Sequence, residues 1–259
     1  MQKCHFFLVK SLGIKGRILY FLQGFFMMVS SLKIVLRIGG SVIGSPPNPE
    51  LISRYAEMIK DLMKEHGIAV VVGGGRPARE FIKLAKDIGL DQEGQDEVAI
   101  SVSRIFAQLI SMRIGGYSWR EIPKSLDEAK RILKEREIVI MGGLKPGMTT
   151  DTVAALLASE IKADMIVKAT DQDGVYTRDP AKYADAEKID EMNFDELIGL
   201  LERDRHIAGI HQIIDPEAAR LLREKKIKTI VVNGFNPKNI LAAINGEKIG
   251  TLIHKKGSA

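Results

Sequence analysis

Residues 137–161 read EIVIMGGLKPGMTTDTVAALLASEI, and this stretch decides the fold. After Glu137, residues 138–141 are apolar without alternation, which is typical of a strand buried on both faces. Two glycines end the strand, and a helical pattern follows with Thr150 or Asp151 as the expected N-cap. A buried strand, a glycine turn and a helix in this order indicate a parallel sheet covered by helices.

The same alternation extends in both directions along the chain from residue 32 onward. It predicts strands at 32–38, 68–72, 137–141, 165–170, 227–234 and 250–253. It predicts helices at 50–66, 76–88, 97–113, 125–135, 151–161, 216–225 and 237–245. The expected fold class is α/β, a three-layer sandwich with a mostly parallel central sheet flanked by helices.

Length and charge restrict the kinds of partner. The chain has 259 residues and is 45% apolar, which suits one α/β domain, expected to be bilobal. Its formal net charge is +5, but four of these charges lie within residues 1–31, which contain no Asp or Glu. The remainder carries +1 with both signs interspersed, so no basic stripe for binding nucleic acid is expected.

Residues 1–31 differ from the rest of the chain. They are basic and apolar, and their longest charge-free run, residues 18–32, is shorter than the ~20 residues of a membrane-spanning helix. We expect an extension that results from a start upstream of the real one, near Met27 and Met28; an interfacial or docking helix and a secretion signal are the alternatives. The single cysteine, Cys4, excludes an intrachain disulfide and fits a cytoplasmic setting without membrane attachment.

Three predicted strands run into glycines, at residues 39–40, 73–75 and 142–143. Glycines let a ligand approach the backbone, whose N–H groups can then bind oxyanions at the carboxyl edge of the sheet. Cations for a phosphate are available in Arg37 on the first strand, Arg79 in the helix after Gly75, and Lys168 near the end of the 165–170 strand, although each alone could be a solvated surface charge. The P-loop and dinucleotide-binding glycine motifs are absent.

Four segments carry a family resemblance, and they occur in order between about residues 32 and 253. They are 38–41 (IGGS), 71–79 (VVGGGRPAR), 142–151 (GGLKPGMTTD) and 173–180 (DGVYTRDP). Together they resemble archaeal-type uridylate kinases of the amino acid kinase superfamily, and the third is the most specific. The resemblance implies the amino acid kinase fold, with an acceptor-nucleotide part at about 32–163 and an ATP part at about 164–255 within a domain of residues 32–259.

The resemblance also implies roles for individual residues. The residues expected to act in catalysis are Arg37, Arg79 and Asp151. Those expected to bind ATP are Gly39, Gly40, Ser41, Gly75, Arg79, Thr170, Asp171, Tyr176 and Asp179. Those expected to bind UMP are Gly74, Asp96, Gly143, Leu144, Lys145, Pro146, Gly147, Met148, Thr149 and Thr150.

The implied reaction is direct in-line phosphoryl transfer from ATP to UMP in pyrimidine nucleotide biosynthesis. Such a reaction depends on positioning and charge neutralisation, with Mg²⁺ accompanying ATP and no metal site of the protein's own. The alternatives are another kinase of this fold, acting on isopentenyl phosphate, N-acetylglutamate or aspartate, and a non-catalytic oxyanion-storage or nucleotide-sensing protein. The resemblance further implies a homohexamer built from dimers, with the apolar residues Val98, Ile105, Leu109 and Met112 of the 97–113 helix as interface or core.

Overall fold

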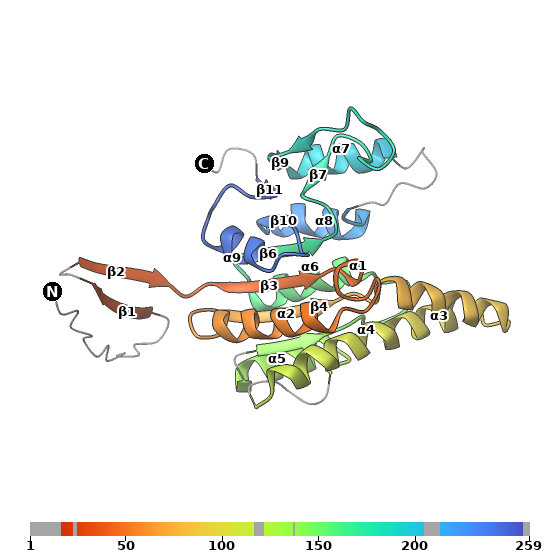
Figure 1. The fold of residues 1–259 in the computed structure, drawn as a ribbon, viewed down its shortest axis with the longest axis horizontal. Coiled ribbons are helices and arrows are strands. Elements are labelled where there is room, and N and C mark those ends of the chain that lie inside the picture. Colours follow the sequence, from red (N-terminus) through yellow and green to blue (C-terminus); the bar gives the residue numbers. More distant parts are fainter. Residues whose placement is uncertain (1–16, 23–24, 117–121, 137, 205–212, 256–259) are drawn as a thin grey trace.

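A computed structural model describes residues 17–22, 25–116, 122–136, 138–204 and 213–255 (Figure 1). Its centre is a sheet of seven strands in the order β5-β4-β3-β6-β10-β11-β9. The strands are β3 (Lys33–Ile38), β4 (Gly67–Val72), β5 (Ile138–Met141), β6 (Met165–Thr170), β9 (Glu191–Asn193), β10 (Thr229–Asn233) and β11 (Thr251–His254). The neighbours from β5 to β10 pair in parallel, whereas β11 runs antiparallel to β10 and parallel to β9.

Helices cover both faces of the sheet, because side chains along each strand alternate between two cores. On β3, Ile34, Leu36 and Ile38 point into one core, and Val35 points into the other. The first core is covered by α2 (Pro49–Leu62), α4 (Gln92–Ile114) and α9 (Lys238–Ile244). The second is covered by α5 (Leu126–Arg136), α6 (Thr150–Ile161), α7 (Phe194–Asp204) and α8 (Pro216–Lys225). The predicted three-layer sandwich is therefore confirmed.

Several short elements were not predicted from the sequence. These are α1 (Gly40–Ile43), β7 (Val175–Tyr176), β8 (Lys188–Ile189), β9 and α7. Helix α3 (Gly75–Asp87) packs against α4. Helix α4 begins five residues before the predicted start, because Asp91 caps it: the Asp91 side chain accepts a hydrogen bond from Gly94 N at 2.9 Å. In the N-terminal segment, β1 (Arg17–Leu22) and β2 (Phe25–Ser30) form an antiparallel pair, so these residues are strands and not part of a docking helix. Within the described residues, no helix has both the length and the apolar character needed to cross a membrane.

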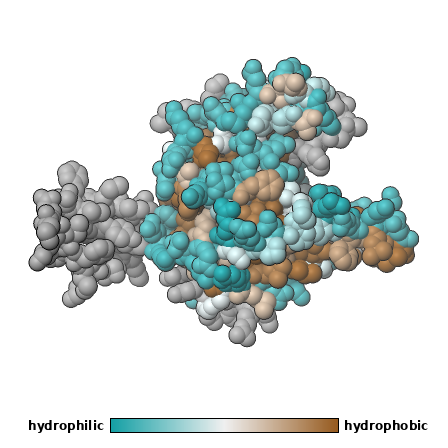
Figure 2. All heavy atoms as spheres, in the orientation of Figure 1, coloured by the Kyte–Doolittle hydropathy of each residue, from teal (hydrophilic) through white to brown (hydrophobic). Residues whose placement is uncertain are grey.

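One face of α4 is apolar but lies outside the core. Ile105, Leu109 and Met112 are 55%, 47% and 65% exposed, and Val98 is half-buried, so for the first three the core alternative is wrong. The core side of α4 is instead formed by Phe106, Ala107 and Ile110. The neighbouring α3 exposes Phe81 and Leu84, and the exposed Ile88 follows this helix. Figure 2 shows hydrophobic side chains gathered at the end of the molecule that α3 forms.

Candidate functional site

The candidate site is a cleft of about 730 Å³ at the carboxyl edge of β3, β4, β5 and β6. This is the edge at which open parallel sheets place their ligands. The side chains and backbone that line it are those of Arg37, Gly40, Ser41, Gly73, Gly74, Gly75, Ala78, Arg79, Ile82, Asp96, Ala99, Ile100, Ser103, Gly143, Lys145, Gly147, Met148, Thr149, Thr150, Asp151, Lys168, Thr170, Asp171, Gln172 and Ile213.

The glycine turns after β3 and β4 are in direct backbone contact. A Cβ on Gly40 would lie 2.0 Å from Gly75 N, and a Cβ on Gly75 would lie 2.1 Å from Gly40 O. Gly75 also has a φ of +63°, a backbone conformation that favours glycine. Both positions therefore require glycine, and their contact forms the floor between the two halves of the cleft.

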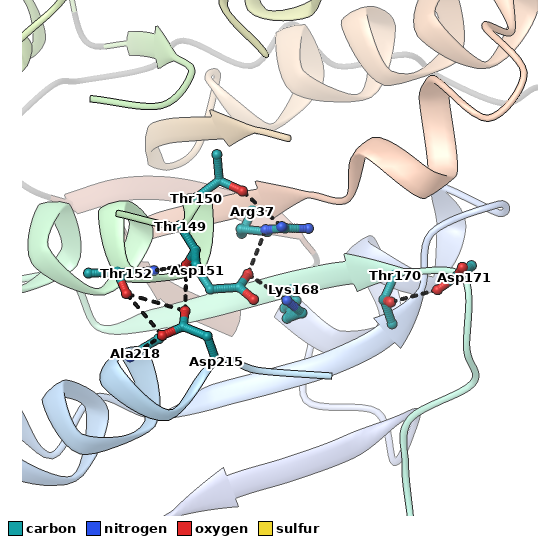
Figure 3. A network of polar contacts seen from close by, with 10 residues as sticks. All are labelled: Arg37, Thr149, Thr150, Asp151, Thr152, Lys168, Thr170, Asp171, Asp215 and Ala218. Carbon is teal, nitrogen blue, oxygen red and sulfur yellow. Dashed lines mark hydrogen bonds and ion pairs between the residues drawn. The ribbon is translucent and has the colours of Figure 1, made fainter. Parts of the chain in front are cut away.

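A cluster of buried charges lies beside this floor (Figure 3). Lys168 Nζ on β6 donates to Asp151 Oδ1 at 2.5 Å, and Arg37 Nε on β3 lies 2.7 Å from the same oxygen. The Arg37 contact is an ion pair without the alignment of a hydrogen bond, whereas Arg37 Nη2 donates to Thr150 Oγ1 at 2.9 Å. The side chains of Arg37, Lys168 and Asp151 are only 15%, 7% and 12% exposed, so neither cation is a solvated surface charge.

Burial and neighbouring charges shift the pKa of both titratable groups in this cluster. Burial alone would raise the pKa of Asp151, but the positive charges of Arg37 and Lys168 outweigh it and hold that pKa below its ordinary value. Burial, together with the charge of Arg37, lowers the pKa of Lys168 to about 8. Asp151 thus lies between two cations, with the carboxylate of Asp215 also close to Lys168, and the two cations line the cleft, where they favour an anionic ligand such as a phosphate.

The start of α6 differs from the prediction, which named Thr150 or Asp151 as its N-cap. The cap is Thr149, whose side chain accepts a hydrogen bond from Thr152 N at 3.1 Å. Asp151 is therefore in the first helical turn, and its carboxylate is directed to the two cations instead of to the helix backbone.

Asp215, which opens α8, holds this helix start in place. Its carboxylate accepts from Thr149 Oγ1 at 2.5 Å and from Thr152 Oγ1 at 3.1 Å, and it also accepts from the backbone N–H groups of Glu217 and Ala218. One side chain thereby joins the N-termini of α6 and α8, which come from the two halves of the chain (Figure 3).

The loop after β5 is fixed by α4. Asp96 Oδ2 accepts a hydrogen bond from Gly147 N at 2.7 Å, and its Oδ1 accepts from Gln92 Nε2 at 2.9 Å. Ser103 Oγ accepts from Gly143 N at 2.8 Å, and Arg104 donates to two carbonyl groups of the same loop.

Most of the predicted site residues line the cleft, and five lie elsewhere. These five are Gly39, Leu144, Pro146, Tyr176 and Asp179. Gly39 is next to the cleft and donates its N–H to Ala169 O, and Leu144 packs against the second core. Tyr176 and Asp179 line a smaller cavity of about 30 Å³, which shares Gln172 and Ile213 with the cleft.

Sequence reasoning missed several residues of the site. Lys168 was noted only as a nearby cation, Asp215 only as a helix start, and Ser103, Arg104 and Gln92 not at all. Four further residues whose types suit nucleotide binding lie outside the described residues: His206 and His211, which could contact a phosphate, and Tyr117 and Trp119, which could stack on a base.

Comparisons with known proteins show the family to which the chain is related. The sequence profile of the amino acid kinase family matches residues 33–233. The chain is 40% identical over 225 residues to the uridylate kinase of Methanocaldococcus jannaschii, covering 86% of this chain and 99% of the relative. It is 38% identical over 222 residues to the uridylate kinase of Methanothermobacter thermautotrophicus, with 86% and 99% covered.

Solved structures give the same result. The crystal structure of uridylate kinase from Archaeoglobus fulgidus superposes with a TM-score of 0.79 at 38% identity and covers 86% of this chain and 100% of that one. The UMP kinase of Bacillus anthracis has a TM-score of 0.72 at 22% identity, covering 87% and 96%, which supports the fold alone.

Proposed function

This chain belongs to the amino acid kinase family, and we infer that it is a uridylate kinase that phosphorylates UMP with ATP. Relatives named uridylate kinase match it over nearly their full length at close to two fifths identity. The observation that carries the inference is the convergence of Arg37, Lys168 and Asp151 with the glycine turns of β3 and β4 in one cleft. This arrangement suits two phosphate groups that must be brought together against their mutual repulsion.

The reaction follows from what these groups can do. An oxygen of the UMP phosphate attacks the γ-phosphorus of ATP, the bond from that phosphorus to the β-bridging oxygen breaks, and UDP and ADP are formed. The UMP phosphate is ionised at neutral pH, so no side chain has to remove a proton. Arg37 and Lys168 stabilise the charge on the transferred group, and Asp151 keeps both cations in place. Arg79, on α3 with its side chain exposed at the cleft, steadies the transferred and accepting phosphates.

The UMP side of the cleft is assigned to the loop after β5. Asp96 binds the ribose hydroxyl groups in this proposal, and its contact with Gly147 N, which joins it to that loop, supports the assignment. The residues that enclose uracil and the acceptor phosphate are Gly74, Gly143, Leu144, Lys145, Pro146, Gly147, Met148, Thr149 and Thr150. Gly143, Lys145, Gly147, Met148, Thr149 and Thr150 line the cleft, which supports this assignment.

The ATP side is assigned to the turns after β3 and β6. Gly39, Gly40 and Ser41 face the triphosphate, with Gly75 and Arg79 between the two nucleotides. Thr170, Asp171, Tyr176 and Asp179 are assigned to the adenosine. Thr170 and Asp171 line the cleft, and Tyr176 and Asp179 line a small cavity that shares Gln172 and Ile213 with it, which supports the assignment. This division places the acceptor part at about 32–163 and the ATP part at about 164–255.

Mg²⁺ enters with ATP as part of the substrate in this proposal. Within the described part of the chain, no group of three or more His, Cys, Asp or Glu side chains could hold a metal ion. Asp151, the buried carboxylate of the cleft, is already bound to two cations. The ATP phosphates and water would therefore supply most of the ligands of the ion.

The exposed apolar face of α3 and α4 is assigned to a subunit interface. Ile105, Leu109 and Met112 on α4, and Phe81 and Leu84 on the adjacent α3, are exposed, and exposed apolar residues of this kind are typical of a contact between copies. A hexamer built from dimers would bury it.

The reaction is tested by incubating the full chain with ATP, Mg²⁺ and UMP and separating the nucleotides by ion-exchange chromatography. Equal amounts of UDP and ADP are expected. ADP without UDP would show ATP hydrolysis and overturn the assignment of UMP as acceptor. The other small-molecule kinases and the oxyanion-storage or sensing proteins considered from the sequence are not favoured, since the relatives compared above are named uridylate kinases.

A further inference from the structure

Arg104 on α4 contacts the backbone of the loop after β5 from outside the cleft. Its Nε donates to Gly143 O at 3.1 Å and its Nη2 donates to Leu144 O at 3.1 Å. Arg104 does not line the cleft, whereas Gly143 and Lys145 of the same loop do. The guanidinium therefore holds two successive carbonyl groups from behind, in the forked geometry that arginine provides and lysine does not.

The direction of the carbonyl groups determines the direction of the next two amides. These peptide bonds are trans, and in a planar trans peptide the N–H points away from the C=O. With the Gly143 and Leu144 carbonyls turned to Arg104, the N–H groups of Leu144 and Lys145 are turned to the opposite side of the loop. Neither N–H donates to another residue in the part of the chain that the structure describes.

The helix and the loop also fit closely at the neighbouring residues. A Cβ on Gly142 would lie 2.7 Å from Arg104 N, so the strand end and the α4 backbone are in contact. The buried Ser103 Oγ accepts from Gly143 N at 2.8 Å and donates to Ile100 O at 2.6 Å. These contacts fix the base of the loop, and Arg104 fixes the orientation of its next two peptide planes.

We propose that Arg104 is a positioning residue for the acceptor: it orients the peptide planes of Gly143 and Leu144 so that the amide of Lys145, a residue that lines the cleft, is presented to the oxygen atoms of the bound nucleotide. The part of this inference that concerns the acceptor rests on the proposed function. Arg104 forms its polar contacts with carbonyl groups and pairs with no carboxylate among the described residues, so its charge also adds to the attraction for an anionic acceptor.

The first test measures the loop without any substrate. Amide hydrogen exchange of peptides covering residues 142–149 is compared among the wild type, Arg104→Lys, Arg104→Met and Arg113→Lys, each in the full chain. Arg113 is the matched control, because it lies on the same helix and pairs with Glu57 at 3.0 Å away from the cleft. Faster exchange in both Arg104 variants and not in the control is expected; wild-type exchange in Arg104→Lys would overturn the proposal.

The second test separates positioning from general damage. Both Arg104 variants are expected to raise KM for UMP about 10- to 100-fold, with KM for ATP and kcat at saturating UMP close to wild type. Wild-type KM for UMP in Arg104→Lys would mean that only the charge matters, and an equal change in both KM values would mean a purely structural role; either result overturns the proposal. If the wild type itself does not phosphorylate UMP, the proposed function fails, and the exchange experiment still decides whether Arg104 orients the loop.

Discussion

Replacing Asp151 with Asn removes the single anion between two buried cations. Arg37 Nε and Lys168 Nζ lie 2.7 Å and 2.5 Å from the same oxygen of Asp151, and all three side chains are at most 15% exposed. The neutral amide has almost the same shape, so the change acts mainly through charge. It leaves two like charges in a region where water cannot screen them.

The expected loss of stability can be stated from this geometry. Breaking a buried ion pair by removing one partner costs about 3–5 kcal/mol. For a domain of this size, 1 kcal/mol corresponds to a change in Tm of about 2–4 °C, so Tm is expected to fall by about 6–20 °C. The rate constant kcat is expected to fall on the order of 10²–10³-fold, because the two cations are no longer held where charge develops.

Thermal unfolding followed by circular dichroism and steady-state kinetics measure the two effects. Asp195→Asn is the control, because Asp195 is 81% exposed and pairs with Arg223 at 3.3 Å on the surface; its effect should stay within about 0–1 kcal/mol. Adding ATP with Mg²⁺ should raise the Tm of Asp151→Asn more than that of the wild type, because the phosphates replace the lost negative charge. Wild-type Tm and kcat in Asp151→Asn would refute the reasoning.

Four further predictions concern other parts of the molecule. Lys168 has a folded pKa of about 8 against an ordinary 10.5, so the folded state binds fewer protons between these values and the stability of the free protein rises with pH across that window. Over the same window kcat/KM for ATP should fall as the ammonium group loses its charge, and Lys168→Arg should remove the break near pH 8 from the pH profile. Asp96→Asn should raise KM for UMP about 10- to 100-fold and reduce the preference for UMP over dUMP; an unchanged preference would speak against ribose binding by this residue. Gly40→Ala should lower the free energy of unfolding in urea by about 1–3 kcal/mol, because its Cβ would meet Gly75 N at 2.0 Å, whereas Gly199→Ala, whose Cβ meets nothing within 4 Å, should not. Leu109→Asp should reduce the mass measured by light scattering if the face of α4 joins two copies, and an unchanged mass would count against that interface.

The main framework of the fold could be predicted from the sequence because local patterns carry it. Apolar runs mark β4 and β5, and β3 and β6 are mostly apolar apart from Lys33, Arg37 and Lys168; each strand is buried along most of its length. The glycine turns at their ends indicated the site, because parallel strands bring their carboxyl ends to one edge. Among the elements that the sequence did not predict, α1, β7, β8 and β9 have only two to four residues each, which is too short for any periodicity to be recognised. Helix α7 has eleven residues, so its absence from the prediction has no such explanation.

The remaining parts of the site depend on contacts between residues distant in the sequence. Arg104 and Gly143 are 39 residues apart, and Thr149 and Asp215 are 66 apart. A side chain can donate to a backbone carbonyl whatever the residue type of its partner, so the sequence contains no signal for a pair such as Arg104 and Gly143. The capping of α6 by Thr149 instead of Thr150 or Asp151 was open for a similar reason, because neighbouring residues can all cap a helix and only the position of Asp215 decides among them.

The most direct test of the assigned reaction measures ADP release by the purified full chain with ATP and Mg²⁺ across a panel of acceptors. The panel contains UMP, CMP, dUMP, GMP, isopentenyl phosphate and N-acetylglutamate, each with and without EDTA. We predict turnover that is selective for UMP and abolished by EDTA. No turnover with UMP, or faster turnover with another member of the panel, would contradict the assignment.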